Sequence, residues 1–354
     1  MKSALLWTAM LLILSACEKR EQTVDFRVLM GAHTEAWQFM ETYEDDNHLR
    51  FFKSVFEGNH TLELSKKQKK SLPQVIHWIW IGPHPFPKTS IKHVHSWIKN
   101  HPNWKVKFWT DRVQELPHPS MELCLISDFH FEYVESLFEA SDNYGEKANL
   151  LRYEILYQQG GLYVDHDVKC LKALTPFHNQ FDLYCGLEPL QKPVLSSSVV
   201  VANNLIGCAP RHPILKKTIE NVCAKWAEIS RLYPGQDRDS IIYRVTHRSF
   251  SPFHDALKTV QIDAPEKNIV FPAAYFNLVD PQFSPYAEHL RDMTWLDSEP
   301  EFERNVERQL RSLFKRQSQM LFFTCLILAA TLLLLICLIY QLRDVKQRMK
   351  RKGR

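Results

Sequence analysis

The sequence predicts an α/β fold with a mainly parallel sheet, and three consecutive segments carry that prediction. Residues 74–81 form a continuous apolar run of β-type residues that ends at Gly82-Pro83, which is typical of a parallel strand buried on both faces. Residues 104–111 alternate polar and apolar side chains and favour a second strand. Residues 91–100, between them, are expected to form the crossover helix.

The stretch 147–168 predicts the next helix and strand and ends in two aspartates. Its first half places apolar side chains on one helical face, and the glycine pair at 160–161 then stops the helix. Residues 162–164 have the character of a buried strand, which delivers Asp165 and Asp167 to its carboxyl end. Two carboxylates there can hold a divalent cation and suit an enzyme that neutralises a departing diphosphate. Acidic residues also gather wherever strands turn into loops, so this pair alone is a weak signal.

Length and charge limit the classes of function. A chain of 354 residues with 45% hydrophobic content can form one large domain with appendages. The net charge is only +4, and residues 343–354 hold seven basic residues against the single acid Asp344. The rest of the chain is therefore close to neutral, and we expect no nucleic-acid partner.

The eight cysteines show no zinc-binding spacing. Three of them lie in apolar segments near the chain ends, and the other five are an odd number, so at least one is expected to be a free thiol. One or two disulfides are possible among these five. They are Cys124, Cys170, Cys185, Cys208 and Cys223.

The N-terminal region predicts export and a linker. Residues 1–17 combine a charged start, a short apolar run and a small-residue exit, as in a signal peptide, although 14–17 also resembles a bacterial lipoprotein processing site. Residues 18–71 have mixed charge and are expected to be an N-terminal extension and linker. Asn59 begins a glycosylation sequon in this segment.

Six segments carry a recognisable pattern in a fixed order. They are 72–82, then 101–104 with 108–111, 151–153 with 160–167, 204–207 with 212–213, 271–272 with 275–276, and His289 with Trp295. Together they resemble glycosyltransferase family 32, the sugar transferases that carry an Asp-X-Asp motif. The resemblance extends over about 72–296, and we expect the catalytic domain at 72–300.

The resemblance implies a GT-A-type domain that uses a nucleotide-sugar donor and retains the anomeric configuration. Asp167 would hold Mn²⁺ or Mg²⁺, and Asp165 would contact the donor and help to orient the metal. His289 would be a further metal ligand or a diphosphate contact. Asp165, Asp167 and Arg152 are the candidate catalytic residues.

The helix before the aspartates supplies further donor-binding candidates. Asn149 and Arg152 are three residues apart and share a helical face, where the family grips the donor sugar. The family usually has Asp where this chain has Asn149, which puts donor identity in question. An ion pair between Arg152 and Glu146, or another surface acid, is the alternative for the arginine. Trp78 and Trp80 point to opposite faces, and Trp80 is the candidate for stacking on the nucleotide base.

The C-terminal region predicts a membrane anchor. Residues 301–319 have apolar side chains at helical spacing among many charges, as in an amphipathic helix. Residues 320–340 are apolar and long enough for a transmembrane helix, and 341–354 form a basic tail. This order predicts a single-pass type I membrane protein of the endoplasmic reticulum or Golgi, with its catalytic domain in the lumen.

Within the family, the membrane anchor favours members resembling inositol phosphoceramide mannosyltransferase. We therefore expect transfer of mannose from GDP-mannose to a membrane glycolipid such as an inositol phosphoceramide. The alternatives are a galactosyl- or glucosyltransferase that uses a UDP-sugar and a glycoprotein or glycan acceptor, or a weakened transferase fold that acts as a membrane-bound binding subunit. No residue stands out as a covalent nucleophile, and Glu188 is either an acceptor contact or a carboxylate at the rim.

Overall fold

The computed structural model describes residues 25–60, 72–260, 267–279, 283–292, 294 and 296, together with six single positions between 313 and 331. The chain divides into two compact units, Met1–Trp295 and Leu296–Arg354. The strands belong to the first unit.

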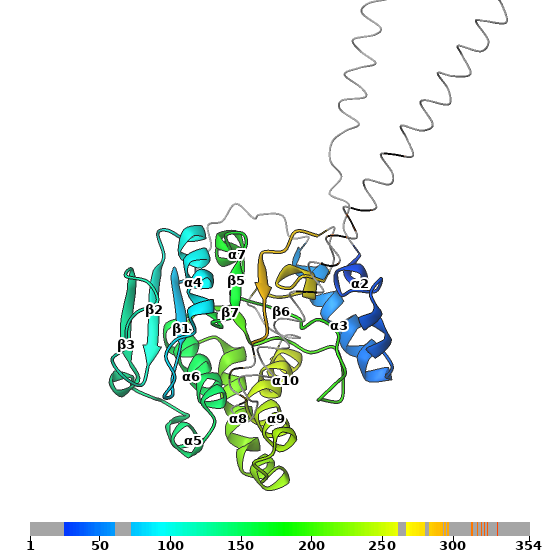
Figure 1. The fold of residues 1–354 in the computed structure, drawn as a ribbon. Helices are drawn as coiled ribbons and strands as arrows, with labels where there is room; N and C mark the ends of the chain where they lie inside the picture. Colours follow the sequence, from blue (N-terminus) through cyan, green and yellow to red (C-terminus); the bar gives the residue numbers. More distant parts are fainter. Residues whose placement is uncertain are drawn as a thin grey trace, which may run out of the picture. The chain divides into compact units, whose positions relative to one another are not determined.

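A seven-stranded sheet is the centre of this unit, in the order β3-β2-β1-β4-β7-β6-β8 (Figure 1). Its neighbours pair in parallel except β7, which runs antiparallel to both β4 and β6. The predicted α/β class with a mainly parallel sheet is confirmed. The strands are β1 Val75–Ile79, β2 Lys105–Thr110, β3 Met121–Leu125, β4 Gly161–Val164, β6 Leu183–Gly186, β7 Leu205–Cys208 and β8 Asn268–Phe271, with β5 Val168–Cys170 and β9 Ala287–His289 in a second, two-stranded sheet.

Helices connect and cover these strands. The predicted crossover is confirmed, because α4 joins β1 to β2 and packs against β5. The long helix α6 packs against β1, β4 and α8. The α-helices are α2 Phe26–Leu29, α3 Tyr43–His60, α4 Lys88–Asn100, α5 Glu135–Ala140, α6 Tyr144–Gln159, α7 Thr175–Gln180, α8 Pro213–Leu232, α9 Arg238–Val245 and α10 Ser251–Val260. The short elements are the 3₁₀ turns η1 Glu35–Phe39, η2 Ile126–Asp128 and η4 Ala273–Tyr275, and the π-helical turn η3 Thr246–Phe250.

The turn between α6 and β4 fixes the place where the aspartates leave the sheet. Gly160 and Gly161 both have positive φ angles, 64° and 99°, as the glycine pair predicted. A Cβ atom at Gly161 would lie 2.7 Å from the carbonyl oxygen of Val75, so only glycine lets β4 approach β1 this closely. The whole of β4 is buried, and the chain emerges from it at Asp165.

Part of the predicted N-terminal extension is folded onto the sheet. Helix α3 packs against β8, and its side chains Phe52 and Phe56 are buried in the main hydrophobic core. Phe56 makes edge-on contacts with Phe271 of β8 and with Tyr275. This part of the extension is therefore a helix that packs on the core, and not a linker.

The prediction of a transmembrane helix is not confirmed. Within the ranges that the structure describes, no helix has both the length and the apolar character needed to cross a bilayer. Apolar composition alone made that prediction, and composition by itself does not establish a spanning helix. The signal peptide, the sequon beyond its first two residues, most of 301–340 and the tail 341–354 lie outside the described residues. The five cysteines of the catalytic region are all free thiols, so the possible disulfides do not form.

Candidate active site

Two separate strand pairings bring His289 beside the two aspartates. Asp165 and Asp167 lie between the end of β4 and the start of β5 at Val168. Strand β5 pairs antiparallel with β9, and this register sets Val168 opposite His289. The ligand atoms of the two aspartates and His289 consequently lie within 4.8 Å of one another. The structure brings the three predicted metal ligands together, although His289 is distant in the sequence from the two aspartates.

Neighbouring groups orient the members of this cluster. The side-chain amide of Asn204 lies 2.6 Å from Nδ1 of His289, which leaves Nε2 directed at Asp167 Oδ2, 3.4 Å away. The backbone N–H of Asp292 donates to Asp167 Oδ2 at 2.7 Å. Such second contacts fix the direction of a ligating imidazole and carboxylate. Asn204 belongs to the 204–207 segment of the family resemblance, but no sequence pattern assigned it a role in the site.

Asp167 is buried but held in its charged form. Burial by itself raises the pKa of this carboxyl, whereas His289, His166 and the Asp292 N–H lower it, and the net pKa is below its ordinary value. Burial lowers the pKa of His289, but the neighbouring Asp167 carboxylate opposes this, and the pKa of His289 is above its ordinary value. Asp167 is thus available as an anion for a cation or a protonated imidazole.

The residues present fit a divalent cation. Two carboxylates and one imidazole form a mixed oxygen and nitrogen donor set, which suits Mn²⁺ better than Mg²⁺, because Mg²⁺ prefers oxygen ligands alone. Asp165, Asp167 and His289 would hold the cation, and Asn204 would keep His289 in place.

Arg152 pairs with Asp165. Its Nη2 atom lies 2.9 Å from Asp165 Oδ1, and its Nη1 donates to the carbonyl oxygen of Asn203. The Tyr163 hydroxyl donates to the same Asp165 oxygen at 2.6 Å, and the guanidinium lies 4.1 Å from the Tyr163 ring centroid. The buried Nε of Arg152 has no hydrogen-bond partner among the described residues. The arginine therefore fixes the direction of Asp165 and keeps one donor unused.

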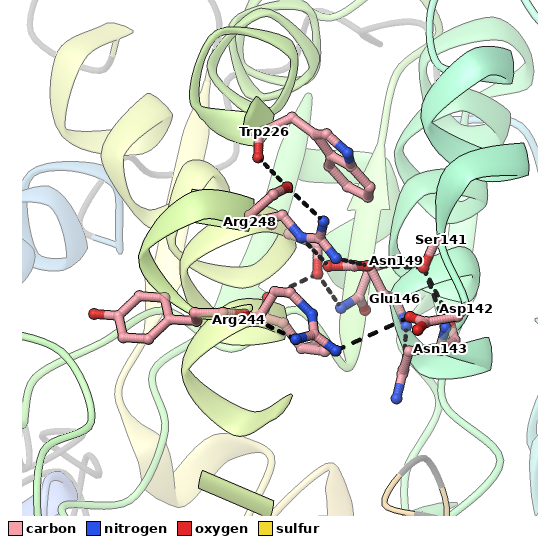
Figure 2. A network of polar contacts seen from close by, with 12 residues as sticks. Ser141, Asp142, Asn143, Glu146, Asn149, Trp226, Arg244 and Arg248 are labelled. Atoms are coloured by element: carbon pink, nitrogen blue, oxygen red, sulfur yellow. Dashed lines mark hydrogen bonds and ion pairs between the residues drawn. The ribbon is translucent and has the colours of Figure 1, made fainter. Parts of the chain in front are cut away.

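The alternative partner of Arg152 is engaged elsewhere. Glu146 forms a buried, two-point ion pair with Arg248, with Nε to Oε1 at 2.9 Å and Nη2 to Oε2 at 2.7 Å. Figure 2 shows Arg248 between Glu146 and Trp226, whose ring centroid lies 3.9 Å from the guanidinium carbon. The predicted alternative, an ion pair between Arg152 and Glu146, is wrong, because Arg248 neutralises Glu146.

Asn149 takes part in a neutral network behind Arg152. Its Nδ2 donates to Ser249 Oγ at 2.8 Å, and its Oδ1 accepts from Asn203 Nδ2 at 3.3 Å. Asn203 also donates to the Tyr153 hydroxyl and accepts from Arg152 through its carbonyl oxygen. Asn149 and Arg152 are therefore linked through Asn203, and the helical face they share is directed into this network. The donor-binding role of Asn149 remains a prediction.

The two tryptophans of the first strand segment do not point to opposite faces as predicted, because residues two apart in an extended chain share a face and both rings contact Phe86. Trp78 is fully buried in the core. Trp80 lies just beyond β1, is half-buried, and donates from Nε1 to the carbonyl oxygen of His84 at 2.8 Å. Its ring makes edge-on contacts with Phe86 and His166. Stacking on a base stays a prediction for Trp80 alone.

His166, between the two aspartates, has hydrogen-bond partners on other segments. Its Nδ1 lies 3.0 Å from Ser90 Oγ and its Nε2 lies 3.1 Å from Thr294 Oγ1. The ring is a support for the turn between β4 and β5.

Sequence reasoning missed one charged pair next to the cluster. Glu188, which follows β6, forms a 2.7 Å ion pair with Arg291, which follows β9. Glu188 is a candidate acceptor contact by its place in the sequence, but no sequence pattern joins it to Arg291. The family segment that ends in Trp295 contains Arg291 and could have drawn attention to it.

Comparisons with known proteins match part of this chain to sugar transferases. Residues 87–183, which include both aspartates, match the family described as "Glycosyltransferase sugar-binding region containing DXD motif". Inositol phosphoceramide mannosyltransferase 3 of Schizosaccharomyces pombe is 28% identical over 167 residues, which are 46% of this chain and 40% of the yeast protein. An uncharacterized glycosyltransferase, L373, of Acanthamoeba polyphaga mimivirus is 29% identical over 46% of this chain and 59% of the viral protein.

The chain thus spans about half the length of the curated relatives it matches. Among solved structures, PaToxG glycosyltransferase is similar over 62% of this chain and 78% of that chain, with 17% identity and a TM-score of 0.43. The resemblance that the sequence motifs indicated is confirmed by this match of residues 87–183 to the DXD-containing sugar-binding region of a glycosyltransferase family.

Proposed function

We propose that this chain is a metal-dependent, retaining glycosyltransferase that moves a hexose from a nucleotide sugar to a lipid acceptor. The observation that carries the proposal is the cluster of Asp165, Asp167 and His289, whose ligand atoms lie within 4.8 Å of one another. Carboxylates and an imidazole at this spacing suit the diphosphate chemistry of a sugar nucleotide. The matched sugar-binding region supports the same reaction class.

The side chains of the site have different proposed roles. Asp165 and Asp167 would hold the cation, which stabilises negative charge on the leaving nucleoside diphosphate when it is bound. Arg152 and Tyr163 hold Asp165 in one direction, so the carboxylate does not have to reorient during the reaction. Trp80 would stack on the nucleotide base.

The proposed bond changes use no covalent nucleophile, since no residue of the sequence stands out as one. The acceptor hydroxyl oxygen forms the new glycosidic bond on the face that the leaving group departs from, as the bond between the sugar and the diphosphate breaks. The acceptor proton passes to the departing phosphate oxygen. This front-face displacement retains the configuration and balances the proton without a protein base.

For the substrates we propose GDP-mannose and an inositol phosphoceramide. The support is the name of the S. pombe relative, which is an inositol phosphoceramide mannosyltransferase. A ceramide acceptor would bring the enzyme to a membrane surface, and we place the reaction in the endoplasmic reticulum or Golgi. Asn149 favours one other candidate, a weakened transferase fold that only binds, because it offers a neutral amide where the family usually has an acid.

The test is a transfer assay with the full chain and Mn²⁺ across GDP-mannose, UDP-galactose and UDP-glucose, with inositol phosphoceramide or a soluble glycan as acceptor. We expect the highest turnover with GDP-mannose and the lipid, and loss of turnover on chelation of the metal. Turnover with a UDP-sugar and a glycan would replace the proposed substrates. If neither GDP nor UDP binds in the presence of Mn²⁺, the whole proposal is overturned. If either nucleotide binds but no sugar is transferred, the chain is the binding subunit and not the enzyme.

A further inference from the structure

The turn after β9 is built on one of the predicted metal ligands. The backbone N–H of Leu290 donates to the Asp167 carbonyl oxygen at 3.0 Å, and the N–H of Asp292 donates to Asp167 Oδ2 at 2.7 Å. Arg291 lies between these two contacts, with a φ angle of 57°. This left-handed conformation is uncommon for a residue with a side chain and is found where surrounding contacts impose it. The backbone therefore fixes Arg291 beside the metal cluster.

Glu188 holds the Arg291 side chain. The pair is 2.7 Å long, the Glu188 side chain is 10% exposed, and the Arg291 side chain is 27% exposed. Because the residues on either side of Arg291 donate to Asp167, this pair lies next to the metal cluster. One guanidinium nitrogen faces Glu188, and an arginine has further N–H groups with which to bind a second anion.

The charges of the site are suited to a ligand that carries both a cation and a diphosphate. The acids Asp165, Asp167 and Glu188 outnumber the arginines Arg152 and Arg291 by one. A divalent cation reverses this balance and leaves an excess of positive charge for a diphosphate. The Arg152 side chain is only 4% exposed and the Arg291 side chain is 27% exposed, so Arg291 is the arginine that a ligand can reach from solvent.

We propose that Arg291 binds the diphosphate of the nucleotide-sugar donor and that Glu188 competes with the diphosphate for it. This rests on the proposed function. Arginine recognises phosphate through two parallel N–H bonds, which are stronger than neutral hydrogen bonds. The donor has to draw Arg291 away from Glu188, so the carboxylate weakens donor binding while the arginine strengthens it.

The competition predicts effects of opposite sign for two neighbouring charges. Titration calorimetry of the full chain with GDP and with UDP, at saturating Mn²⁺, gives the Kd for each variant. Arg291→Gln should weaken binding by about 10-fold or more, the loss of a charge-assisted hydrogen bond. Glu188→Gln should tighten binding by about 3-fold to 10-fold, because the arginine is released. The double variant should bind as weakly as Arg291→Gln.

The chain contains a matched control pair. Arg211 also has a left-handed backbone, with a φ angle of 60°, and pairs with Glu132 through two contacts outside the site. Arg211→Gln and Glu132→Gln should leave the nucleotide Kd within about 2-fold of the wild type, because this is an exposed ion pair outside the binding site. Arg291→Lys, which keeps the charge, should recover part of the affinity that Arg291→Gln loses.

The outcomes separate the two proposals. No Mn²⁺-dependent nucleotide binding by the wild type would overturn the proposed function. Wild-type binding together with an unchanged Kd in Arg291→Gln would overturn the role of Arg291 alone. Weaker binding in both Arg291→Gln and Glu188→Gln would also overturn it, since the pair would then act as a support. Melting temperatures measured in parallel identify a variant that fails to fold, and Arg291→Lys then provides the comparison.

Discussion

Helix α6 carries two buried contacts between an acid and an arginine that serve different ends. Near its first turn, Glu146 pairs with Arg248, and further along the same helix, Arg152 pairs with Asp165. Both arginines are almost fully buried. The two pairs differ in how completely their hydrogen-bonding groups are used, and this difference separates a structural pair from one suited to bind a ligand.

The Glu146–Arg248 pair uses the polar atoms of both side chains. Glu146 also accepts from Ser141 Oγ at 2.7 Å, and Arg248 donates from Nη1 to Ser230 Oγ at 2.9 Å, while Trp226 covers the guanidinium (Figure 2). Burial raises the pKa of Glu146, although Arg248 opposes the rise. Such a pair ties α6 to α8 and η3 and has nothing to offer a substrate.

The Arg152–Asp165 pair is less complete. The Arg152 Nε has no partner among the described residues, and the Asp165 side chain is 24% exposed. Asp165 accepts from Arg152 and Tyr163 through the same oxygen, Oδ1. Its other oxygen is therefore the one from which a cation could be bound.

Asp167→Asn should have the largest effect, and that effect should be on turnover rather than on stability. We expect turnover to fall by at least about 10³-fold, or about 4 kcal/mol, because the site loses an anionic ligand at the point of charge development. The melting temperature should stay close to that of the wild type, because Asn keeps the shape and can still accept from the Asp292 N–H. Donor hydrolysis and thermal unfolding measure the two quantities. A large fall in melting temperature with residual turnover would mean that Asp167, like Glu146, mainly stabilises the fold.

Glu146→Gln should have the reverse profile. The substitution leaves Arg248 buried without its counter-ion, and breaking one side of a buried pair costs about 3–5 kcal/mol. Urea unfolding measures this loss, and Mn²⁺-nucleotide affinity of the folded fraction should be unchanged. Adding Arg248→Met to Glu146→Gln should recover part of the stability, since removal of both charges is less costly than removal of one. If affinity falls while stability holds, the contrast between the two pairs is wrong.

The local parts of this arrangement could be predicted from the sequence. The apolar run at 74–81, the glycine pair at 160–161 and the aspartates after the strand each depend on residues close together in the chain, and the structure has each as expected. His289 is a prediction by family resemblance, since no periodicity connects it with Asp167. The pairing of β5 with β9 supplies that connection.

The remaining parts depend on contacts between distant segments. The partner of Arg152 is set by the packing of α6 against β4, which the spacing of Glu146 and Arg152 along one helix does not report. The antiparallel direction of β7 has no signature in the short apolar segment 205–208. Apolar composition at 320–340 predicted a transmembrane helix that the described residues do not contain. Composition and spacing report local preference, whereas these features depend on which segments meet.

Asp45 extends the comparison to a carboxylate outside the matched sugar-binding region. Buried on α3, it accepts from Ser197 Oγ, Ser198 N–H and Thr42 N–H, and so ties α3 to the segment that follows Glu188. Burial raises the pKa of Asp45, but these hydrogen bonds lower it more, to below its ordinary value of 3.8. The unfolded chain therefore takes up the proton first on acidification. The stability that the ionised carboxylate contributes is present above about pH 4 and is lost as the pH falls further.

Asp45→Asn should remove this dependence. At pH 7 the variant should be less stable than the wild type by about 2 kcal/mol, and the difference should shrink as the pH falls below about 4. Urea unfolding at several pH values measures the difference. Asp46→Asn, at the exposed neighbouring position on α3, is the matched control and should show little change at any pH. If the stability difference between the wild type and Asp45→Asn does not change with pH, the charge of Asp45 is not what stabilises this contact.

Asn149→Ala should have the smallest effect and tests whether the neutral network supports the incomplete pair. Without Asn149, the side chain of Asn203 loses one acceptor, and the carbonyl oxygen that binds Arg152 loses part of its support. We expect kcat/KM for the donor to fall by about 10-fold, or about 1.4 kcal/mol, with the affinity for Mn²⁺ alone unchanged. Asn149→Asp should be closer to the wild type, because the new carboxylate keeps an acceptor for Asn203. If Ala and Asp are equally impaired, the amide donor to Ser249 is the contact that matters, and Asn149 acts through η3 rather than through Arg152.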